Sequence, residues 1–237
     1  WKAVKAFYEP FDLVTSPSKI IQKTLSEQGI DSVVLSNGVD SSRFNPGAKS
    51  ASFKKSVCGN NKMVLCAGRL GFEKNVDVVI RAFAGLSEEN SFLVITGDGP
   101  ARKYCEKLAR DLGIRDKVKF TGFIPSKDLP SYYASADCFV TASTFETQGL
   151  ALLEAMSCGA VSVGANALAI PEAISNNKTG FLFDSLDVLQ CREKIDKVLS
   201  LSNGKRKLFS IAARKKAMRH SVEKTTQKLL KIYDSVM

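Results

Sequence analysis

Short apolar runs rich in Val, Phe and Leu recur roughly every 25 residues through the middle of the chain. Runs this short and continuous are typical of strands that are buried on both faces of a parallel sheet, because such strands have no polar side. We therefore predict six strands, at residues 62–68, 91–97, 117–122, 137–143, 160–164 and 180–183.

The segments between these runs carry apolar residues at helical spacing. Residues 74–86 place Val76, Val79 and Phe83 on one side of a helix, and residues 101–112 repeat the pattern. Alternating strands and helices form βαβ units with right-handed crossovers. The pattern predicts an α/β fold with a Rossmann-like, doubly wound parallel sheet, whose ligand crevice lies beyond the carboxyl ends of the strands.

The pattern changes at both ends of the chain. Residues 1–36 hold two predicted strands, 11–16 and 32–36, around a helix at 18–28, as at the edge of a preceding domain. Ser, Asn, Gly and Pro then mark residues 37–60 as a linker. We expect the main domain to span residues 61–220 and a C-terminal helix to span 221–237. The helices expected after the last strand lie at about 186–200, 205–218 and 221–235.

The segment TFETQGLALLEAMSCGA, residues 144–160, follows the fourth predicted strand and carries the most chemistry. Gly149 precedes a predicted helix that begins at Leu150, and the N–H groups at a helix N-terminus favour a phosphate. Glu154 on this helix could accept hydrogen bonds from ribose hydroxyls, and Glu146 in the preceding loop could accept them from a sugar. From spacing alone, two ordinary surface glutamates are the alternative interpretation.

Two further loops follow predicted strands. Arg69 and Lys74 lie in the loop after the first strand of the sheet, where two cations could neutralise a diphosphate, or could simply be solvated surface charges. Gly68 and Gly97 end the first two strands, and the TGDGP turn at Gly97 suits a close approach to a ligand, or merely a turn. There is no GxGxxG or Walker motif, which weakens a dinucleotide or P-loop assignment.

The charge is uneven along the chain. The net charge is +10, and residues 189–237 hold 13 Lys and Arg against 4 Asp and Glu, whereas the preceding residues are close to neutral. This asymmetry favours an anionic surface near the C-terminal segment, with a solvated helical face as the alternative. Nucleic acid is not an expected partner, because few aromatic residues are interleaved with these charges.

Cysteine and histidine usage narrows the chemistry further. The six cysteines show no CxxC spacing, which favours buried, reduced thiols in a cytoplasmic protein. The only histidine is His220, so a multi-histidine metal site is excluded, and no D-x-D pair stands in a loop. No apolar stretch approaches the roughly 18 residues that a membrane-spanning helix needs. We therefore predict no metal site and no spanning helix.

The segments GRLGFEKN, VITGDGP, FTGFIP, SADCFVTASTFETQGLALLEAMSCGA and KTGFLF follow one another in this order. The ordered set resembles the donor domain of retaining glycosyltransferases with two Rossmann-like domains, the GT4 group within the GT-B fold. Glu146 and Glu154 match the E-x7-E motif of this group. The resemblance covers about residues 11–235. It implies that residues 1–36 end an acceptor domain, most of which lies outside this sequence, and that the helix at 221–237 returns toward it.

The resemblance also implies a role for each site residue. Arg69 and Lys74 would hold the diphosphate of the donor, together with the amides of Gly149 and Leu150. Glu154 would bind the ribose hydroxyls, and Glu146 would bind the hydroxyls of the transferred sugar. The backbone around Phe123 and Ile124 would meet the base.

One motif position departs from the common pattern of the group. Thr147 and Gln148 stand where many members have Gly and Phe. The resulting E-T-Q-G-L variant resembles diacylglycerol glucosyltransferases, which favours a lipid acceptor.

The resemblance implies transfer of a hexose, with retention, from a UDP- or GDP-sugar to a lipid or glycan acceptor, without a metal or another cofactor. UDP-glucose is the expected donor, and the enzyme is expected to be cytoplasmic and peripheral on the inner face of a membrane. This chain alone is expected to be an incomplete enzyme. The sequence leaves open a double displacement in place of same-face attack. It also leaves open a 2-epimerase of the same fold and a non-catalytic subunit that binds nucleotide sugars.

Overall fold

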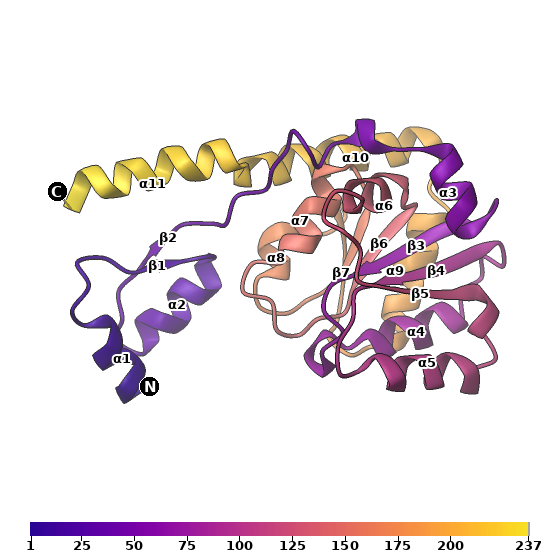
Figure 1. Ribbon diagram of the computed structural model, residues 1–237, viewed down its shortest axis with the longest axis horizontal. Coiled ribbons are helices and arrows are strands. Elements are labelled where there is room, and N and C mark those ends of the chain that lie inside the picture. Colours follow the sequence, from indigo (N-terminus) through magenta and orange to yellow (C-terminus); the bar gives the residue numbers. More distant parts are fainter. Residues whose placement is uncertain (237) are drawn as a thin grey trace.

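A computed structural model describes residues 1–236, with side chains as far as Ser235. Within this range the strands of the main sheet are β3 (Lys62–Ala67), β4 (Ser91–Thr96), β5 (Val118–Gly122), β6 (Cys138–Thr141), β7 (Ser162–Ala165) and β8 (Gly180–Phe183). All are parallel, in the order β5-β4-β3-β6-β7-β8 (Figure 1). The predicted α/β class and the six predicted strands are confirmed.

Helices cover both faces of this sheet. One layer contains α4 (Val76–Ala84), α5 (Arg102–Asp111) and α9 (Val188–Leu199). The other contains α3 (Ala51–Cys58), α6 (Leu129–Ser135), α7 (Leu150–Ser157) and α10 (Asn203–Ala217) (Figure 1). The interior of the sheet is therefore apolar, as in β3, where Met63, Val64 and Leu65 are fully buried. Each such side chain contributes about 1.5–3 kcal/mol of burial free energy.

All six cysteines are free and buried within these layers, as the sequence predicts. Burial raises the pKa of the Cys66 thiol to about 12, although Cys66 lies at the end of β3 beside the strand ends that carry the site. A thiol that stays protonated is a poor nucleophile, so Cys66 has a packing role.

The order of the strands reverses between β3 and β6. From β3 the chain adds β4 and then β5 on one side, and then returns to place β6, β7 and β8 on the other side. β3 and β6 pair directly, Val64 with Cys138 and Leu65 with Phe139. Such a switch point opens a crevice at the carboxyl ends of the two strands, because their following loops leave in different directions.

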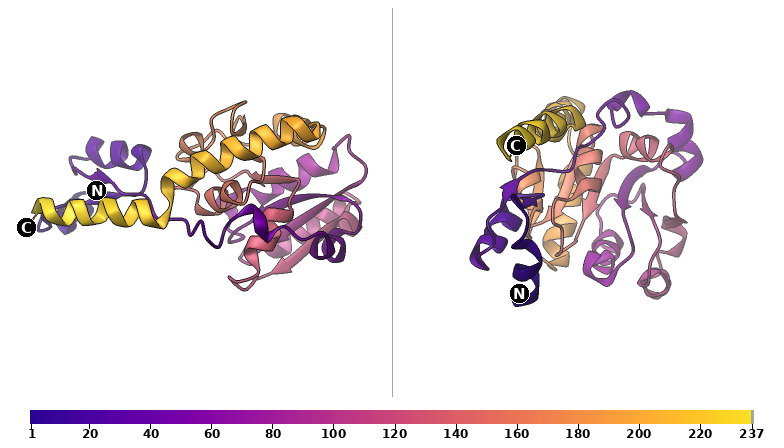
Figure 2. Two further views of the ribbon diagram at one scale, coloured as in Figure 1. Left: turned by 90° about the horizontal axis from the view of Figure 1, so that it is seen from above. Right: turned by 60° about the vertical axis from the view of Figure 1, so that its left-hand side comes forward.

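A small N-terminal unit stands beside the large domain (Figures 1 and 2). It consists of α1 (Lys2–Tyr8), β1 (Thr15–Ser16), α2 (Lys19–Glu27) and β2 (Val33–Val34), with β1 and β2 paired in parallel. Helix α11 (Val222–Val236) extends from the large domain toward the same side. The chain that leaves β2 crosses the start of α11. There the Val39 N–H donates to the His220 carbonyl at 2.8 Å, and the Val222 N–H donates to the Val39 carbonyl at 3.1 Å.

Several short elements differ from the expectation. β1 and β2 are two residues each, shorter than the predicted strands, because each pairs with one neighbour only within the described residues. Helix α3 lies inside the segment predicted as an irregular linker, where the Ser50 hydroxyl caps it and Phe53 packs edge-on against Tyr132. Helices α1, α6 and α8 (Ile170–Ala173) were not predicted, because helices of four to seven residues complete too few turns to show a period.

We expect that Gly97→Ala destabilises the large domain by about 3 kcal/mol or more. Gly97 has a φ of 109°, and a Cβ there would lie 1.9 Å from the carbonyl oxygen of Gly68. The loops after β3 and β4 can approach this closely only without a side chain. Urea unfolding of the two proteins measures the loss.

Gly204→Ala is the matched control, because a Cβ at Gly204 in α10 meets no atom within 4 Å. This change should be neutral or stabilising by up to about 1 kcal/mol, since alanine is the better helix former. Equal stability of the two variants would contradict the close approach at Gly97.

Candidate functional site

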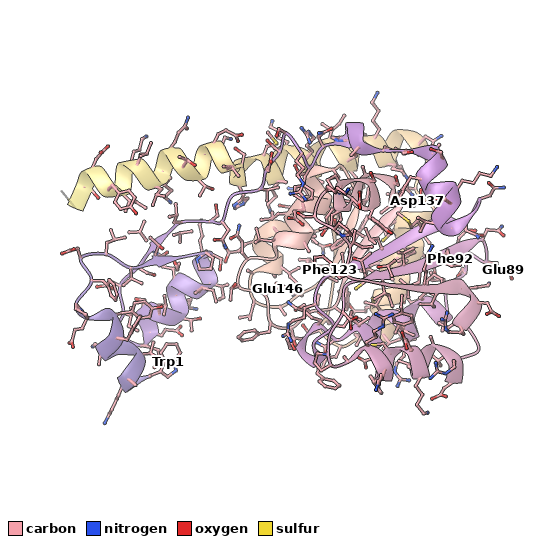
Figure 3. The ribbon with its side chains drawn as sticks, in the orientation of Figure 1. Trp1, Glu89, Phe92, Phe123, Asp137 and Glu146 are labelled. Atoms are coloured by element: carbon pink, nitrogen blue, oxygen red, sulfur yellow. The ribbon has the colours of Figure 1, made fainter. Side chains whose placement is uncertain are left out.

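A cavity of about 440 Å³ opens at the carboxyl ends of β3 and β6. Its wall contains six of the predicted site residues: Gly68, Arg69, Lys74, Glu146, Gly149 and Leu150. They come from two loops far apart in the sequence, which the β3–β6 pairing brings together. Glu146 lies on the side of the large domain that faces the N-terminal unit (Figure 3).

The loop after β3 brings two cations to the cavity, each beside a carboxylate. The Lys74 ammonium lies 2.7 Å from the Glu146 carboxylate, and both side chains are largely buried. The Arg69 guanidinium pairs with Glu73, but the Arg69 side chain is 63% exposed. Lys74 is therefore held in place, whereas Arg69 has room to turn toward an anion in the cavity.

Asn75 joins this loop to the loop after β6. It adopts a left-handed conformation, with φ 46°, which asparagine tolerates better than most residues. Its side-chain amide donates to the carbonyl of Ala142 at 3.2 Å and to the hydroxyl of Thr144 at 3.1 Å. The Thr144 N–H in turn donates to the Glu73 carbonyl at 3.2 Å. These bonds fix the approach of Lys74 to Glu146.

The N-terminus of α7 faces the cavity. Gly149 precedes the helix with φ 79°, and within the described chain no side chain caps the first turn. The N–H groups at this end carry partial positive charge, and Arg69 and Lys74 lie across the same cavity. Two cations and a helix N-terminus around one space can stabilise a group with two or more negative charges, such as a diphosphate.

Glu154 lies on the second turn of α7, outside the cavity wall. The Tyr133 hydroxyl donates to its carboxylate at 3.0 Å, and the Tyr133 ring packs edge-on between Phe44 and Phe139. Burial raises the pKa of the Glu154 carboxyl, while the hydrogen bond from Tyr133 and the charge of Arg43 lower it. Burial and the neighbouring Glu154 together hold the pKa of Tyr133 well above its usual value, so Tyr133 stays a donor.

The remaining predicted residues lie at the same edge of the sheet but not in the cavity wall. The Gly97 N–H donates to the Gly122 carbonyl at 2.8 Å, beside Gly68. Phe123 follows β5 and is 80% exposed, whereas Ile124 packs partly against the core. The assignment of Phe123 and Ile124 to the base stays a prediction.

The sequence patterns give no site role to Tyr133, Asn75 or Gln148. Tyr133 belongs to α6, a helix too short to show a period. Gln148 was noted as unusual, but its hydrogen-bond partner, Asn37, lies 111 residues away in the sequence. Local signals exist for two of the three: Asn75 directly follows Lys74, and Gln148 lies between Glu146 and Gly149.

Among residues 1–236, no three His, Cys, Asp or Glu side chains lie close enough together to hold a metal ion. That the reaction needs neither a metal nor another cofactor stays a prediction.

Comparison with known proteins bears on this site. The family model for glycosyl transferases group 1 matches residues 48–216. The chain is 32% identical over 239 residues to sulfoquinovosyl transferase SQD2 of Arabidopsis thaliana, which covers 97% of this chain and 46% of the relative. It is 33% identical over 190 residues to alpha-monoglucosyldiacylglycerol synthase of Streptococcus pneumoniae, which covers 76% and 43%.

A third relative is the GDP-mannose-dependent alpha-mannosyltransferase of Corynebacterium glutamicum, 34% identical over 191 residues, which covers 79% of this chain and 44% of the relative. The chain thus spans less than half the length of these three curated relatives.

Solved structures share the fold. The crystal structure of Anabaena Alr3699/HepE in complex with UDP and glucose superposes with a TM-score of 0.90 at 24% identity, covering 99% of this chain and 66% of that one. The C-terminal domain of a glycosyl transferase group 1 family protein (LpcC) from Francisella tularensis gives 0.68 at 25% identity, covering 78% of this chain and 100% of that one. The predicted Rossmann-like donor-domain fold is confirmed.

We expect that Tyr133→Phe weakens binding of a nucleoside diphosphate by about three- to tenfold, if Glu154 holds the ribose. The loss should grow as the pH falls. Without the hydroxyl, the pKa of Glu154 rises further above its usual value, so more of the carboxyl is protonated and fewer acceptor sites remain. Calorimetry at mildly alkaline and mildly acidic pH measures both effects.

Tyr132→Phe is the control. Tyr132 is the neighbouring residue and is also buried, but its ring packs against Phe53. Identical pH dependence of binding in the wild type and in the Tyr133 variant would contradict the role of this hydrogen bond.

Proposed function

This chain belongs to the glycosyl transferases group 1 family, and we propose that it provides the donor site of an enzyme that transfers a hexose from a nucleotide-diphosphate sugar, with retention. One observation carries the proposal. Arg69, Lys74 and the N-terminus of α7 surround the same cavity, and Glu146 closes it on the side that faces the N-terminal unit. A sugar linked to a diphosphate presents the complementary groups, two phosphates followed by hydroxyls.

The chemistry that we propose needs little beyond electrostatics. As the bond between the sugar and the diphosphate breaks, negative charge grows on the phosphate oxygens. Arg69, Lys74 and the amides of Gly149 and Leu150 would stabilise this charge more strongly than they stabilise the intact donor, which lowers the barrier. In this proposal the reaction needs no metal.

Glu146 and Glu154 take different parts in this proposal. Glu146 accepts hydrogen bonds from the transferred sugar, and its contact with Lys74 keeps it beside the reacting bond. Glu154 accepts hydrogen bonds from ribose, which does not change during the reaction. The relatives reported above are transferases, and nothing in the site favours the 2-epimerase alternative.

For donor and acceptor we propose UDP-glucose and a lipid. The E-T-Q-G-L variant and the alpha-monoglucosyldiacylglycerol synthase among the relatives support this choice. GDP-mannose is the second candidate donor, favoured by the mannosyltransferase relative. Titrating this chain with UDP-glucose and with GDP-mannose separates the two.

Among residues 1–236, no helix is both long enough and apolar enough to cross a membrane. A lipid acceptor lies in a membrane, and we propose that α10 attaches the enzyme to the membrane surface. Lys205, Lys207 and Lys215 are exposed on this helix, next to exposed Leu208 and Ile211. Basic residues near an anionic surface each contribute about 1 kcal/mol, which suits reversible binding.

We predict opposite kinetic signatures for the two glutamates. In the full-length enzyme, Glu154→Ala should mainly weaken nucleotide binding, and Glu146→Ala should mainly lower turnover, each by about 1.5–3 kcal/mol. Calorimetry with UDP and steady-state transfer kinetics measure the two quantities. Glu193→Ala, an exposed glutamate on α9, is the matched control and should change neither. Unchanged UDP affinity in Glu154→Ala would show that the ribose assignment is wrong.

We predict that the full-length enzyme sediments with anionic vesicles and not with neutral ones, and that added salt releases it. Charge attraction is screened over a Debye length of about 10 Å at 0.1 M salt, whereas apolar insertion is not. Neutralising three exposed cations of α10 should weaken sedimentation: Lys205→Gln, Lys207→Gln and Lys215→Gln.

An equal charge change on α5 is the control, with the substitutions Lys103→Gln, Lys107→Gln and Arg110→Gln. Equal sedimentation with both kinds of vesicle, or an equal effect of the two triple variants, would contradict attachment through α10.

A further inference from the structure

Gln148 lies in the donor loop (residues 144–149) between Glu146 and Gly149, yet its side chain bonds outside the cavity. It is 5% exposed. Its Oε1 accepts from the Asn37 N–H at 2.7 Å, and its Nε2 donates to the Asn37 carbonyl at 2.9 Å. The side-chain amide therefore pairs with Asn37 as a neighbouring strand would, and satisfies both backbone groups of that residue.

Asn37 lies where the chain crosses from the N-terminal unit to the large domain. On one side of it, the Leu35 N–H donates to the Ser16 carbonyl within the N-terminal unit, at 2.8 Å. On the other side, Val39 is bonded to the residues that begin α11. The intervening crossing segment (residues 36–38) is tightly enclosed, since a Cβ at Gly38 would lie 2.6 Å from the Cα of Val222.

A second polar connection also leads from the N-terminal unit to Glu146. The Glu172 carboxylate of α8 accepts from the N–H groups of Lys19 at 3.1 Å and Ile20 at 2.7 Å, in the first turn of α2. Figure 1 shows α8 on the side of the large domain that faces α2. Just before α8, the Ala169 N–H donates to the Glu146 carbonyl at 3.2 Å. Both connections therefore converge on the donor loop.

We propose that Gln148 is a positioning residue that couples the crossing segment to Glu146, so that the placement of the N-terminal unit sets the position of the Glu146 carboxylate. This inference rests on the proposed function, in which Glu146 holds the transferred sugar. A rotation at residues 36–38 must either move the donor loop or break both bonds to Gln148. Breaking them leaves buried polar groups unpaired, so the loop follows the rotation.

The movement falls on Glu146 and not on the phosphate-binding end of the loop. Gly149 continues into α7, and Leu152 and Leu153 anchor that helix in the core. Glu146 has no apolar anchor of this kind: its backbone carbonyl accepts from Ala169, which belongs to the second connection to the N-terminal unit, and its carboxylate pairs with Lys74. The arrangement of the two units therefore acts on the sugar end of the site, while the diphosphate end stays in place.

The test compares Gln148→Met with the wild type in the full-length enzyme. Methionine keeps the volume of the side chain but removes both hydrogen bonds to Asn37. We expect kcat for sugar transfer to fall by about ten- to a hundredfold, because a small displacement of a positioning group has effects of this size. The affinity for UDP should stay within about threefold of the wild type, since the phosphate contacts are unmoved. Amide hydrogen exchange in residues 144–147 should become faster.

Gln190→Met is the matched control. Gln190 also forms two hydrogen bonds, accepting from the Asp184 N–H at 3.1 Å and donating to its carboxylate at 2.9 Å, but it lies on α9 at the surface. This variant should keep the wild-type kcat and the wild-type exchange of residues 144–147. If Gln148→Met fails to fold, Gln148→Glu keeps the acceptor for the Asn37 N–H but sets a carboxylate oxygen in place of the donor to the Asn37 carbonyl, and it should lower kcat in the same direction.

The two proposals fail in different ways. A wild-type enzyme that binds UDP-glucose and GDP-mannose no better than it binds glucose would overturn the proposed function. A wild-type kcat in both the Gln148→Met and the Gln148→Glu variants, in an enzyme that does bind the donor, would overturn the coupling alone. Unchanged exchange at residues 144–147 in Gln148→Met would also overturn it, whatever the ligand.

Discussion

The direct pairing of β3 with β6 is the constraint on which the site depends. It involves only two residue pairs, Val64 with Cys138 and Leu65 with Phe139, yet it joins the two halves of the sheet. Because both strands run in the same direction, the loops that follow them meet at one edge. Lys74 reaches Glu146 across 72 residues of sequence for this reason. The buried apolar faces of the sheet set the register, and the register in turn sets the contact between the two charged groups.

Most charged groups of the site pair with an opposite charge, but the pairs differ in how exposed they are. The Lys74–Glu146 pair is largely buried, so the two side chains hold one geometry. The Arg69–Glu73 pair is more exposed and can exchange partners at low cost. Glu154 has no cation within bonding distance among the described residues and relies on a neutral donor, Tyr133. Burial raises the pKa of the Glu154 carboxyl, and any further hydrogen-bond donor to the carboxylate would lower this pKa.

The sequence predicts what local patterns encode. Apolar runs predict the six strands, and the rule that parallel strands end at one edge places Arg69, Lys74, Glu146 and Gly149 on the same side of the sheet, where they line one cavity. The contacts of Tyr133 with Glu154 and of Gln148 with Asn37 follow from packing between distant segments, which no local period contains. The short helices could not be predicted for a related reason. Helix α8 has only four residues, and it is stabilised by tertiary contacts that no local pattern reveals.

Gln148 in the donor loop connects two parts of the molecule, the donor loop and the crossing segment. Gln148 is buried and satisfies both backbone groups of Asn37, so that the crossing segment and the donor loop form one hydrogen-bonded unit. An unpaired buried amide is costly, so the glutamine is stable only with Asn37 in place. The motif that contains Glu146 therefore also holds the crossing segment in place.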